Sequence, residues 1–300
     1  MKIEQKENIQ KIFGIIKSKI NSCKNNEDKK KTIMNFADKI IESKDEYLCF
    51  EFAKEYGASL GIDNLYKISD IILKSKNPYL CTFFPKYFKL KNFNKFVKVI
   101  KNSPVFYILN FLRTFPNFNA NYFAEEILQK GNVEQNIDYV YEFDIDDIIP
   151  HSIKIAKEGT AKQNLNYIIG IDSIFETYPE EAISKNVENI ISSGDANIDF
   201  NYVMMFKPQK DLEKHAKVIA DSDDLLLNYL ACNNWPDQDP LELAMFTKVI
   251  HNHTKAELEN RLIFRLRILD KDSRRKIISK YFDIKTEKSN QEFENESEKD

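Results

Sequence analysis

Few residues in this 300-residue chain have the types and spacing that catalysis or metal binding requires. His251 and His253 stand two residues apart, which places them on different faces of a helix, and no third ligand accompanies them. The motifs of serine hydrolases, zinc proteases and phosphate-binding loops do not occur. We therefore expect a protein without a catalytic residue, a cofactor or a metal ion.

The cysteines predict neither a disulfide framework nor a zinc site. Successive cysteines lie 26, 32 and 151 residues apart and form no CxxC pair, so we expect reduced thiols and a cytoplasmic protein. The N-terminal stretch carries a charge every few residues, and no run approaches the roughly 18 apolar residues of a membrane span. We expect no membrane partner.

The charged residues are unevenly distributed. In the whole chain 44 Lys and Arg nearly balance 47 Asp and Glu, which excludes a uniformly basic nucleic-acid binder. Residues 71–124, however, carry nine basic residues and no carboxylate, a net charge of +9. Residues 125–199 carry five basic and sixteen acidic residues, a net charge of −11. The chain therefore has two oppositely charged stretches that meet near residue 124.

Within the basic stretch, residues 86–101 alternate lysines with aromatic side chains. The lysines are Lys86, Lys89, Lys91, Lys95, Lys98 and Lys101. Lysines near a phosphate backbone gain free energy by counterion release, and exposed rings can stack on bases. The same alternation also arises on a helix with a solvated lysine face over buried rings. Binding of a polyanion or acidic surface and simple solvation are both open interpretations.

A second candidate contact surface lies near the C-terminus. Five of the six arginines fall there: Arg261, Arg265, Arg267, Arg274 and Arg275. Arginine is enriched among residues that dominate binding energy, although these side chains could equally pair with the chain's own carboxylates. The only tryptophan, Trp235, precedes a predicted helix start at Asp239-Pro240. It is either a wedge between structural units or an exposed anchor for a partner.

An internal repeat must position these residues. The ten-residue segments that begin at Gly131, Gly159 and Gly194 align without gaps, and extending their register gives one key position in each unit at intervals of 27–35 residues. The key positions are Phe52, Phe84, Phe111, Tyr139, Tyr167, Tyr202, Tyr229 and Arg261. We expect this row to pack in the core, the alternative being an exposed stacking ladder. The polar row before it (Asn110, Asp138, Asn166, Asn201, Asn228, Asn260) could line a surface or bond carbonyl groups between units.

Each unit also carries a helix-start signal seven or eight residues before its key position. The cap residues are Asp45, Asn77, Ser103, Asn132, Thr160, Asp195, Ser222 and Thr254. An apolar run that is compatible with a helix precedes each cap. A two-helix unit of this length cannot bury its own apolar face, so neighbouring units must stack.

We therefore predict an all-α protein. Its main part is a right-handed α-solenoid of about eight two-helix repeats over residues 32–284. An N-terminal capping helix and a linker occupy residues 1–31, and residues 285–300 form a disordered acidic tail.

This pattern resembles the broad class of α-helical-hairpin repeats that includes HEAT, armadillo and tetratricopeptide arrays. A narrower likeness lies in Asn166-Tyr167, Asn201-Tyr202 and Asn228-Tyr229, which look like the base-reading and stacking residues of Pumilio-type repeats. The first resemblance implies a scaffold, and the second implies RNA binding.

We expect a non-catalytic scaffold that engages a macromolecular partner, most readily a protein, through its charged surfaces. One alternative is an RNA or single-stranded nucleic-acid binder that uses residues 86–101. A second alternative is a HEAT-like enzyme that modifies nucleic acid.

Overall fold

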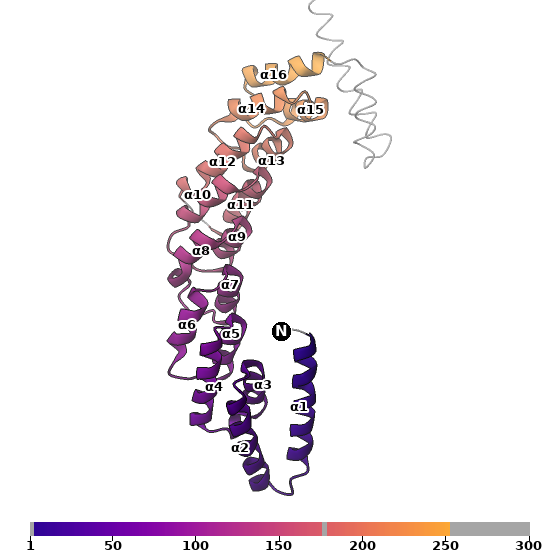
Figure 1. The fold of residues 1–300 in the computed structure, drawn as a ribbon. Coiled ribbons are helices and arrows are strands. Elements are labelled where there is room, and N and C mark those ends of the chain that lie inside the picture. Colours follow the sequence, from indigo (N-terminus) through magenta and orange to yellow (C-terminus); the bar gives the residue numbers. More distant parts are fainter. Residues whose placement is uncertain (1–2, 176–178, 253–300) are drawn as a thin grey trace, which may run out of the picture. The chain divides into compact units, whose positions relative to one another are not determined.

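The structure is a computed structural model that describes residues 3–175 and 179–252 (Figure 1). These residues form sixteen α-helices and two short 3₁₀ helices, with no strand among them, which confirms the predicted all-α class. Two predictions lie outside the described residues: the arginine cluster at 261–275 and the acidic tail at 285–300.

The chain divides into two compact units, Met1–Lys154 and Ile155–Asp300. The first unit contains α1 (Ile3–Asn21), α2 (Asn26–Ser43), α3 (Glu46–Tyr56), α4 (Ile62–Ser75), α5 (Pro78–Tyr87), α6 (Phe93–Lys101), α7 (Val105–Thr114), α8 (Ala124–Lys130) and α9 (Val133–Glu142). The boundary falls within α10 (Ile149–Glu158). The second unit continues with α11 (Ala161–Ile174), α12 (Glu181–Ser193), α13 (Ala196–Phe206), α14 (Leu212–Asp221), α15 (Leu225–Asn234) and α16 (Pro240–His251).

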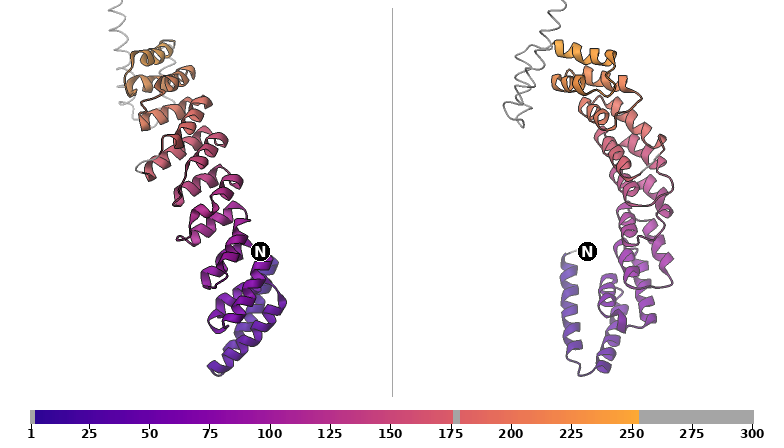
Figure 2. Two further views of the ribbon diagram at one scale, coloured as in Figure 1. Left: turned by 90° about the vertical axis from the view of Figure 1, so that its left-hand side faces the viewer. Right: turned by 180° about the vertical axis from the view of Figure 1, so that it is seen from behind.

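Within each unit the helices pack in neighbouring pairs and form two layers. In the first unit α3, α5, α7 and α9 pack in succession as one layer, while α2, α4 and α6 follow one another in the other. In the second unit α11, α13 and α15 form one layer, and α12, α14 and α16 form the other. Figure 2 shows this succession within each unit from two further sides. Helix α1 packs on α2 and buries Ile9, Ile16 and Ile20.

Side-chain caps set most of the predicted helix starts. The side chains of Asp45, Asn77, Asn132, Thr160 and Asp195 each accept a hydrogen bond from a backbone N–H in the first turn that follows. Such a bond satisfies a donor that has no partner within the helix. The capping box predicted at Thr160 is present, and Asn132 makes another with Gln135.

Two predicted caps are wrong, and Thr254 lies outside the described residues. Pro104, rather than Ser103, is the cap of α7. Asp224, rather than Ser222, caps α15, because the Ser222 hydroxyl accepts from the Asp224 N–H and so completes the turn before the helix. The register of this last pair therefore moves by two residues.

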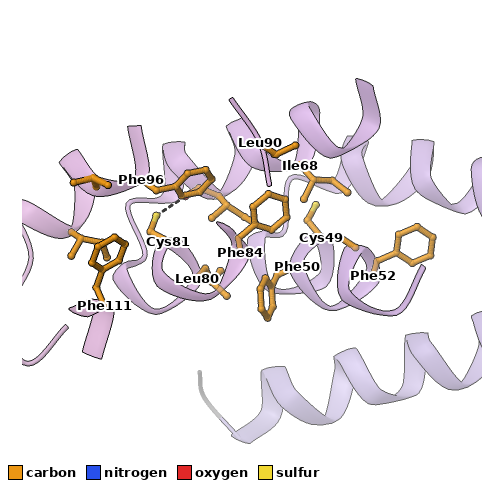
Figure 3. Close-up of a cluster of buried hydrophobic side chains, with 14 of the residues drawn as sticks. Cys49, Phe50, Phe52, Ile68, Leu80, Cys81, Phe84, Leu90, Phe96 and Phe111 are labelled. Carbon is orange, nitrogen blue, oxygen red and sulfur yellow. Dashed lines mark hydrogen bonds between the residues drawn. The ribbon is translucent and has the colours of Figure 1, made fainter. Parts of the chain in front are cut away.

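The predicted key row is the core of both units. The side chains seven residues after the caps of α3, α5, α7, α9, α11 and α13 are buried, and Figure 3 shows the first three, Phe52, Phe84 and Phe111, within one apolar cluster. Because α15 is capped at Asp224, its equivalent residue is Ala231, although Tyr229 is also buried. The preference for core packing is confirmed for the described members of the row.

A second buried position lies four residues after these caps. In most of the pairs a polar side chain there joins the two helices, whereas α7 has Ile108 instead. In three pairs it is an asparagine. The amide nitrogen of Asn136 donates to the carbonyl oxygens of Gly131 (3.2 Å) and Asn132 (2.8 Å). Asn164 makes the same contacts with Gly159 and Thr160 at 3.3 and 2.9 Å.

The third asparagine, Asn228, donates to the carbonyls of Ile219 (3.1 Å) and Asp224 (2.9 Å). In α3 and α5 a thiol takes the equivalent place, and Figure 3 shows Cys49 and Cys81 within the apolar cluster. Cys49 contacts the carbonyl of Ile40 at 3.4 Å, and Cys81 contacts that of Ile72 at 3.8 Å. Burial raises the pKa of both thiols to about 12, which keeps them protonated. All of these bonds satisfy carbonyls at or near the end of the preceding helix or at the cap itself.

The same position also contacts the next pair. The amide oxygen of Asn136 lies 2.7 Å from Nδ1 of His151, and that of Asn164 accepts from the side-chain amide of Asn186 at 2.7 Å. Since the nitrogen of Asn136 already donates, its oxygen must accept, so His151 carries a proton on Nδ1. Burial lowers the pKa of His151 to about 4, and the ring is neutral at pH 7.

Asp199 occupies this position in α13, so a carboxylate oxygen stands where the asparagines of the other pairs have an amide nitrogen. Its Oδ1 lies 2.6 Å from Nδ1 of His215, and its Oδ2 is buried with no hydrogen-bond partner within the described ranges. Burial raises the pKa of Asp199, and the hydrogen bond with His215 acts against that shift. The buried, unpartnered Oδ2 and the raised pKa both indicate that ionisation of Asp199 costs more free energy in the folded protein than in the unfolded chain.

Asp199→Asn should therefore raise the free energy of unfolding by about 1–2 kcal/mol near pH 7, because the amide fills the same space without an ionisable group and can donate as the equivalent asparagines do. Because the pKa of Asp199 is higher in the folded state, protonation of this residue stabilises the wild type. The stabilisation is complete below the unfolded pKa of about 3.9, and it is lost as the pH rises through the folded pKa. Urea titrations at several pH values measure both effects.

The matched control is Asn164→Asp, which should destabilise the protein near neutral pH by a similar amount or more. A loss of stability in Asp199→Asn near pH 7 would contradict this prediction, since it would mean that this buried position stabilises a carboxylate more than a neutral amide.

Candidate partner-binding surface

An exposed group of lysines lies where α5 ends and α6 begins. Lys86 is in the last turn of α5, Lys89 and Lys91 lie in the connecting loop, and Lys95 and Lys98 are on α6. All five are exposed, and the part of the chain that the structure describes provides none of them with an ion-pair partner. We call these five residues the lysine surface.

The folding of α6 explains why the lysines point outward. The helix buries Phe96, Val97 and Ile100 on one side, so Lys95 and Lys98 are left on the other. Phe96 packs against Phe84 with ring centroids 5.9 Å apart. On α6 the alternation therefore places the ring of Phe96 in the core beneath a solvated lysine face.

A hollow of about 420 Å³ opens within the lysine surface. Its walls include Lys86, Lys89 and Lys91 together with the rings of Phe88, Phe93 and Phe115. Cationic groups over an apolar floor can hold a carboxylate or a phosphate that is attached to an apolar group. The tertiary structure thus brings together three of the predicted site residues around one concavity.

Lys101, the sixth predicted lysine, has a different environment. Its amino group lies 3.2 Å from Glu126 and 4.6 Å from the centroid of the Tyr122 ring. Similarly, Arg113 on α7 pairs with Glu142 at 2.5 Å and Asp138 at 3.2 Å on α9. These pairs join the basic stretch to the acidic stretch, and they partly neutralise both where they meet. Lys101 is not part of the lysine surface.

The structure contradicts the proposal of Trp235 as an exposed anchor. The indole is buried, its N–H donates to the carboxylate of Glu242, and its ring lies edge-on to Phe246 with centroids 4.9 Å apart. Trp235 is therefore a wedge between α15 and α16 in the second unit, which was the structural alternative. Arg261, Arg265, Arg267, Arg274 and Arg275 lie outside the described residues.

The predicted polar row does not form one surface. Asn166 and Asn201 are exposed, Asn110 and Asp138 are half-buried, and Asn228 is buried. The neighbouring tyrosines are buried as well. A buried ring cannot stack on a base, so the likeness to Pumilio-type repeats does not extend to base stacking.

The described residues also set limits on other chemistry. Within them no group of three His, Cys, Asp or Glu side chains is placed to hold a metal ion. The four cysteines are free. None of the described helices combines the length and apolar character that crossing a bilayer requires.

Sequence reasoning missed one group of exposed side chains, the rings of Tyr79 on α5 and Phe106 on α7. Both stand two residues after the observed caps, Asn77 and Pro104. The equivalent residue of α9 is Glu134. An aromatic residue at this position in successive units was a usable signal, but it required the correct cap of α7.

The molecule is an all-helical protein whose helices pack in neighbouring pairs within each unit. Comparisons with protein-family models, curated proteins and solved structures found no match for this chain. Functional inference therefore rests on its own residues.

The burial of the single tryptophan can be tested by fluorescence. The native protein should show blue-shifted Trp235 emission and little quenching by acrylamide, because the indole is enclosed between α15 and α16. Unfolding in urea should shift the emission to the red and raise the quenching constant. Strong quenching of the folded protein would contradict the buried position.

The Glu242→Gln variant separates the hydrogen bond to the indole from the charge of the carboxylate. Burial raises the pKa of Glu242. The amide can still accept from the indole N–H, so the emission should stay blue-shifted while the ionisable group is removed.

Proposed function

We propose that this chain is a non-catalytic helical-repeat protein that binds an acidic surface of another protein through the lysine surface. The observation that carries the proposal is a group of five exposed lysines, three of which line a hollow, in a stretch of 54 residues without a carboxylate. We further propose that the helix pairs form a right-handed solenoid of about eight repeats in the cytoplasm.

The energetics favour such a partner. Neighbouring lysines repel one another in the free protein, and each carboxylate of a partner relieves part of that repulsion. Complementary surface charges act mainly on the association rate and on specificity, and both effects weaken with salt. The apolar floor formed by Phe88, Phe93 and Phe115 would add a contribution that is insensitive to salt.

A single-stranded nucleic acid is the second candidate, since exposed lysines also attract phosphates and Tyr87 is exposed nearby. Two observations count against it. Phe96 is buried, and Phe88 and Phe93 are only partly accessible, so a continuous stacking platform is missing. The chain also uses lysine rather than arginine here, and lysine lacks bidentate recognition of bases and phosphates.

The remaining alternative, an enzyme that modifies nucleic acid, would need a catalytic aspartate beside accessible aromatic rings. Asp237, two residues after Trp235, is the residue that the sequence offers for this role. Trp235 is buried against Glu242 in the structure. The proposal therefore keeps the expectation of a protein without catalytic residues.

Binding of two fluorescent probes, an oligoglutamate and an oligouridylate of about 20 units each, tests the proposal by anisotropy. The wild type should bind oligoglutamate more tightly, with an affinity that falls as salt rises from about 50 to 200 mM. Lys89→Glu combined with Lys95→Glu should weaken this binding at least about tenfold, because two attractive charges become repulsive.

The matched control reverses two exposed lysines on α2, Lys30 and Lys31, and should bind like the wild type. Tighter binding of oligouridylate that depends on Lys89 and Lys95 would replace the proposal with the nucleic-acid alternative. No binding of either probe at micromolar protein concentrations would refute both.

A further inference from the structure

A second hollow, of about 370 Å³, lies between α5 and α7 beside the lysine surface. Its lining includes Tyr79, Phe83 and Lys86 from α5, and Phe106, Tyr107 and Arg113 from α7. Helices α5 and α7 pack directly on each other, so the hollow is part of one continuous layer. We call it the aromatic hollow.

Two rings of the aromatic hollow are unusually accessible for large apolar side chains. Phe106 is 57% exposed and Tyr79 is 48% exposed. Each ring contacts another on its own helix, since Tyr79 lies 4.7 Å from Phe83 and Phe106 lies 5.4 Å from Tyr107 between centroids. The two aromatic pairs therefore form the walls of the hollow and still have accessible surface.

In the preceding pair the equivalent aromatic residue already has a hydrogen-bond partner. Tyr47 also stands two residues after its cap, but its hydroxyl accepts a hydrogen bond from the side-chain amide of Asn77 at 2.7 Å, and the ring is only partly accessible. Among the described helices, exposed rings two residues after a cap therefore occur at the α5–α7 step.

Lys86 connects the aromatic hollow to the lysine surface, because it lines both hollows. The equivalent cations of the neighbouring helices are engaged. Lys54 lies over the Tyr87 ring at 5.7 Å, and Arg113 is paired with Glu142 and Asp138. Among the equivalent cations of α3, α5 and α7, Lys86 is therefore the one that is available to a ligand.

We propose that the aromatic hollow receives one large apolar side chain of a short acidic peptide segment, whose carboxylates contact Lys86 and the lysine surface. This inference rests on the proposed function and names the part of the partner that is recognised. Two adjacent helices span about 16–20 Å. An extended segment of about five or six residues covers that distance.

The surroundings favour a peptide over the other possible occupants. A nucleic-acid strand carries a charge at every phosphate, and beyond Arg113 it would meet Asp138 and Glu142 on α9. A second copy of this chain in a two-fold contact would bring two lysine surfaces together. A peptide segment needs only one apolar side chain and a few neighbouring carboxylates.

Fluorescent heptapeptides with a central phenylalanine or a central alanine, each flanked by three glutamates, test the inference in the full-length protein. The phenylalanine peptide should bind about tenfold more tightly, which corresponds to about 1.4 kcal/mol. Tyr79→Ser combined with Phe106→Ser should remove this difference and leave the binding of oligoglutamate unchanged. Lys86→Ala should weaken the binding of both peptides.

Ile62→Ser is the matched control, because Ile62 is 55% exposed on α4 outside both hollows. It should bind both peptides like the wild type. Because all of the substituted side chains are accessible, the variants should keep their helical circular dichroism and urea midpoint.

Equal affinity for the two peptides in the wild type would overturn the inference and leave the proposed function intact, provided that oligoglutamate still binds. Weaker oligouridylate binding in Tyr79→Ser/Phe106→Ser, with no change for the peptides, would assign the rings to base stacking. A dimer in light scattering that Phe106→Ser dissociates would assign the hollow to a second copy.

Discussion

The helix pairs depend on one constraint: the end of a helix can be buried only if its last carbonyl groups receive hydrogen bonds. In a two-layer arrangement the turn between the paired helices lies against the core, where water cannot satisfy the last carbonyls of a helix. The residue four places after the cap supplies the missing donor, as Asn136, Asn164 and Asn228 show. In α9 and α11 the amide oxygen of this residue also contacts the next pair, so there one side chain fixes both the turn and the stacking.

That constraint also explains why the candidate binding residues can differ from one helix pair to the next. The polar groups that stabilise each pair are inside, and the surface residues are left to vary from unit to unit. Helices α5, α6 and α7 have used this freedom for exposed lysines and aromatic rings, whereas α9 carries carboxylates. The ion pairs of Lys101 with Glu126 and Arg113 with Glu142 join the two regions. A charged surface and an aromatic hollow can therefore occur together without weakening the core.

The fold was largely predictable because its signals are local. A cap such as Thr160 acts on amides within its own first turn, and a key residue such as Tyr167 is recognised by its spacing from that cap. The errors were also local. Ser222 has the right side chain for a cap, but the turn that it completes places the helix start at Asp224. The polar row was assigned one position before the key residue, while the residues that bond the carbonyls stand three before it, as with Asn136 and Tyr139.

The sequence by itself determined the helical class, the pairing of helices, the buried key row and the stretch of basic charge, since composition and short-range spacing decide these. Only the tertiary structure decided which lysines surround a hollow, that Lys101 is paired, that Trp235 is enclosed and that Tyr79 and Phe106 form one concavity. Accessibility and contact between helices depend on packing between residues far apart in the chain, and one-dimensional spacing carries no information about which faces meet.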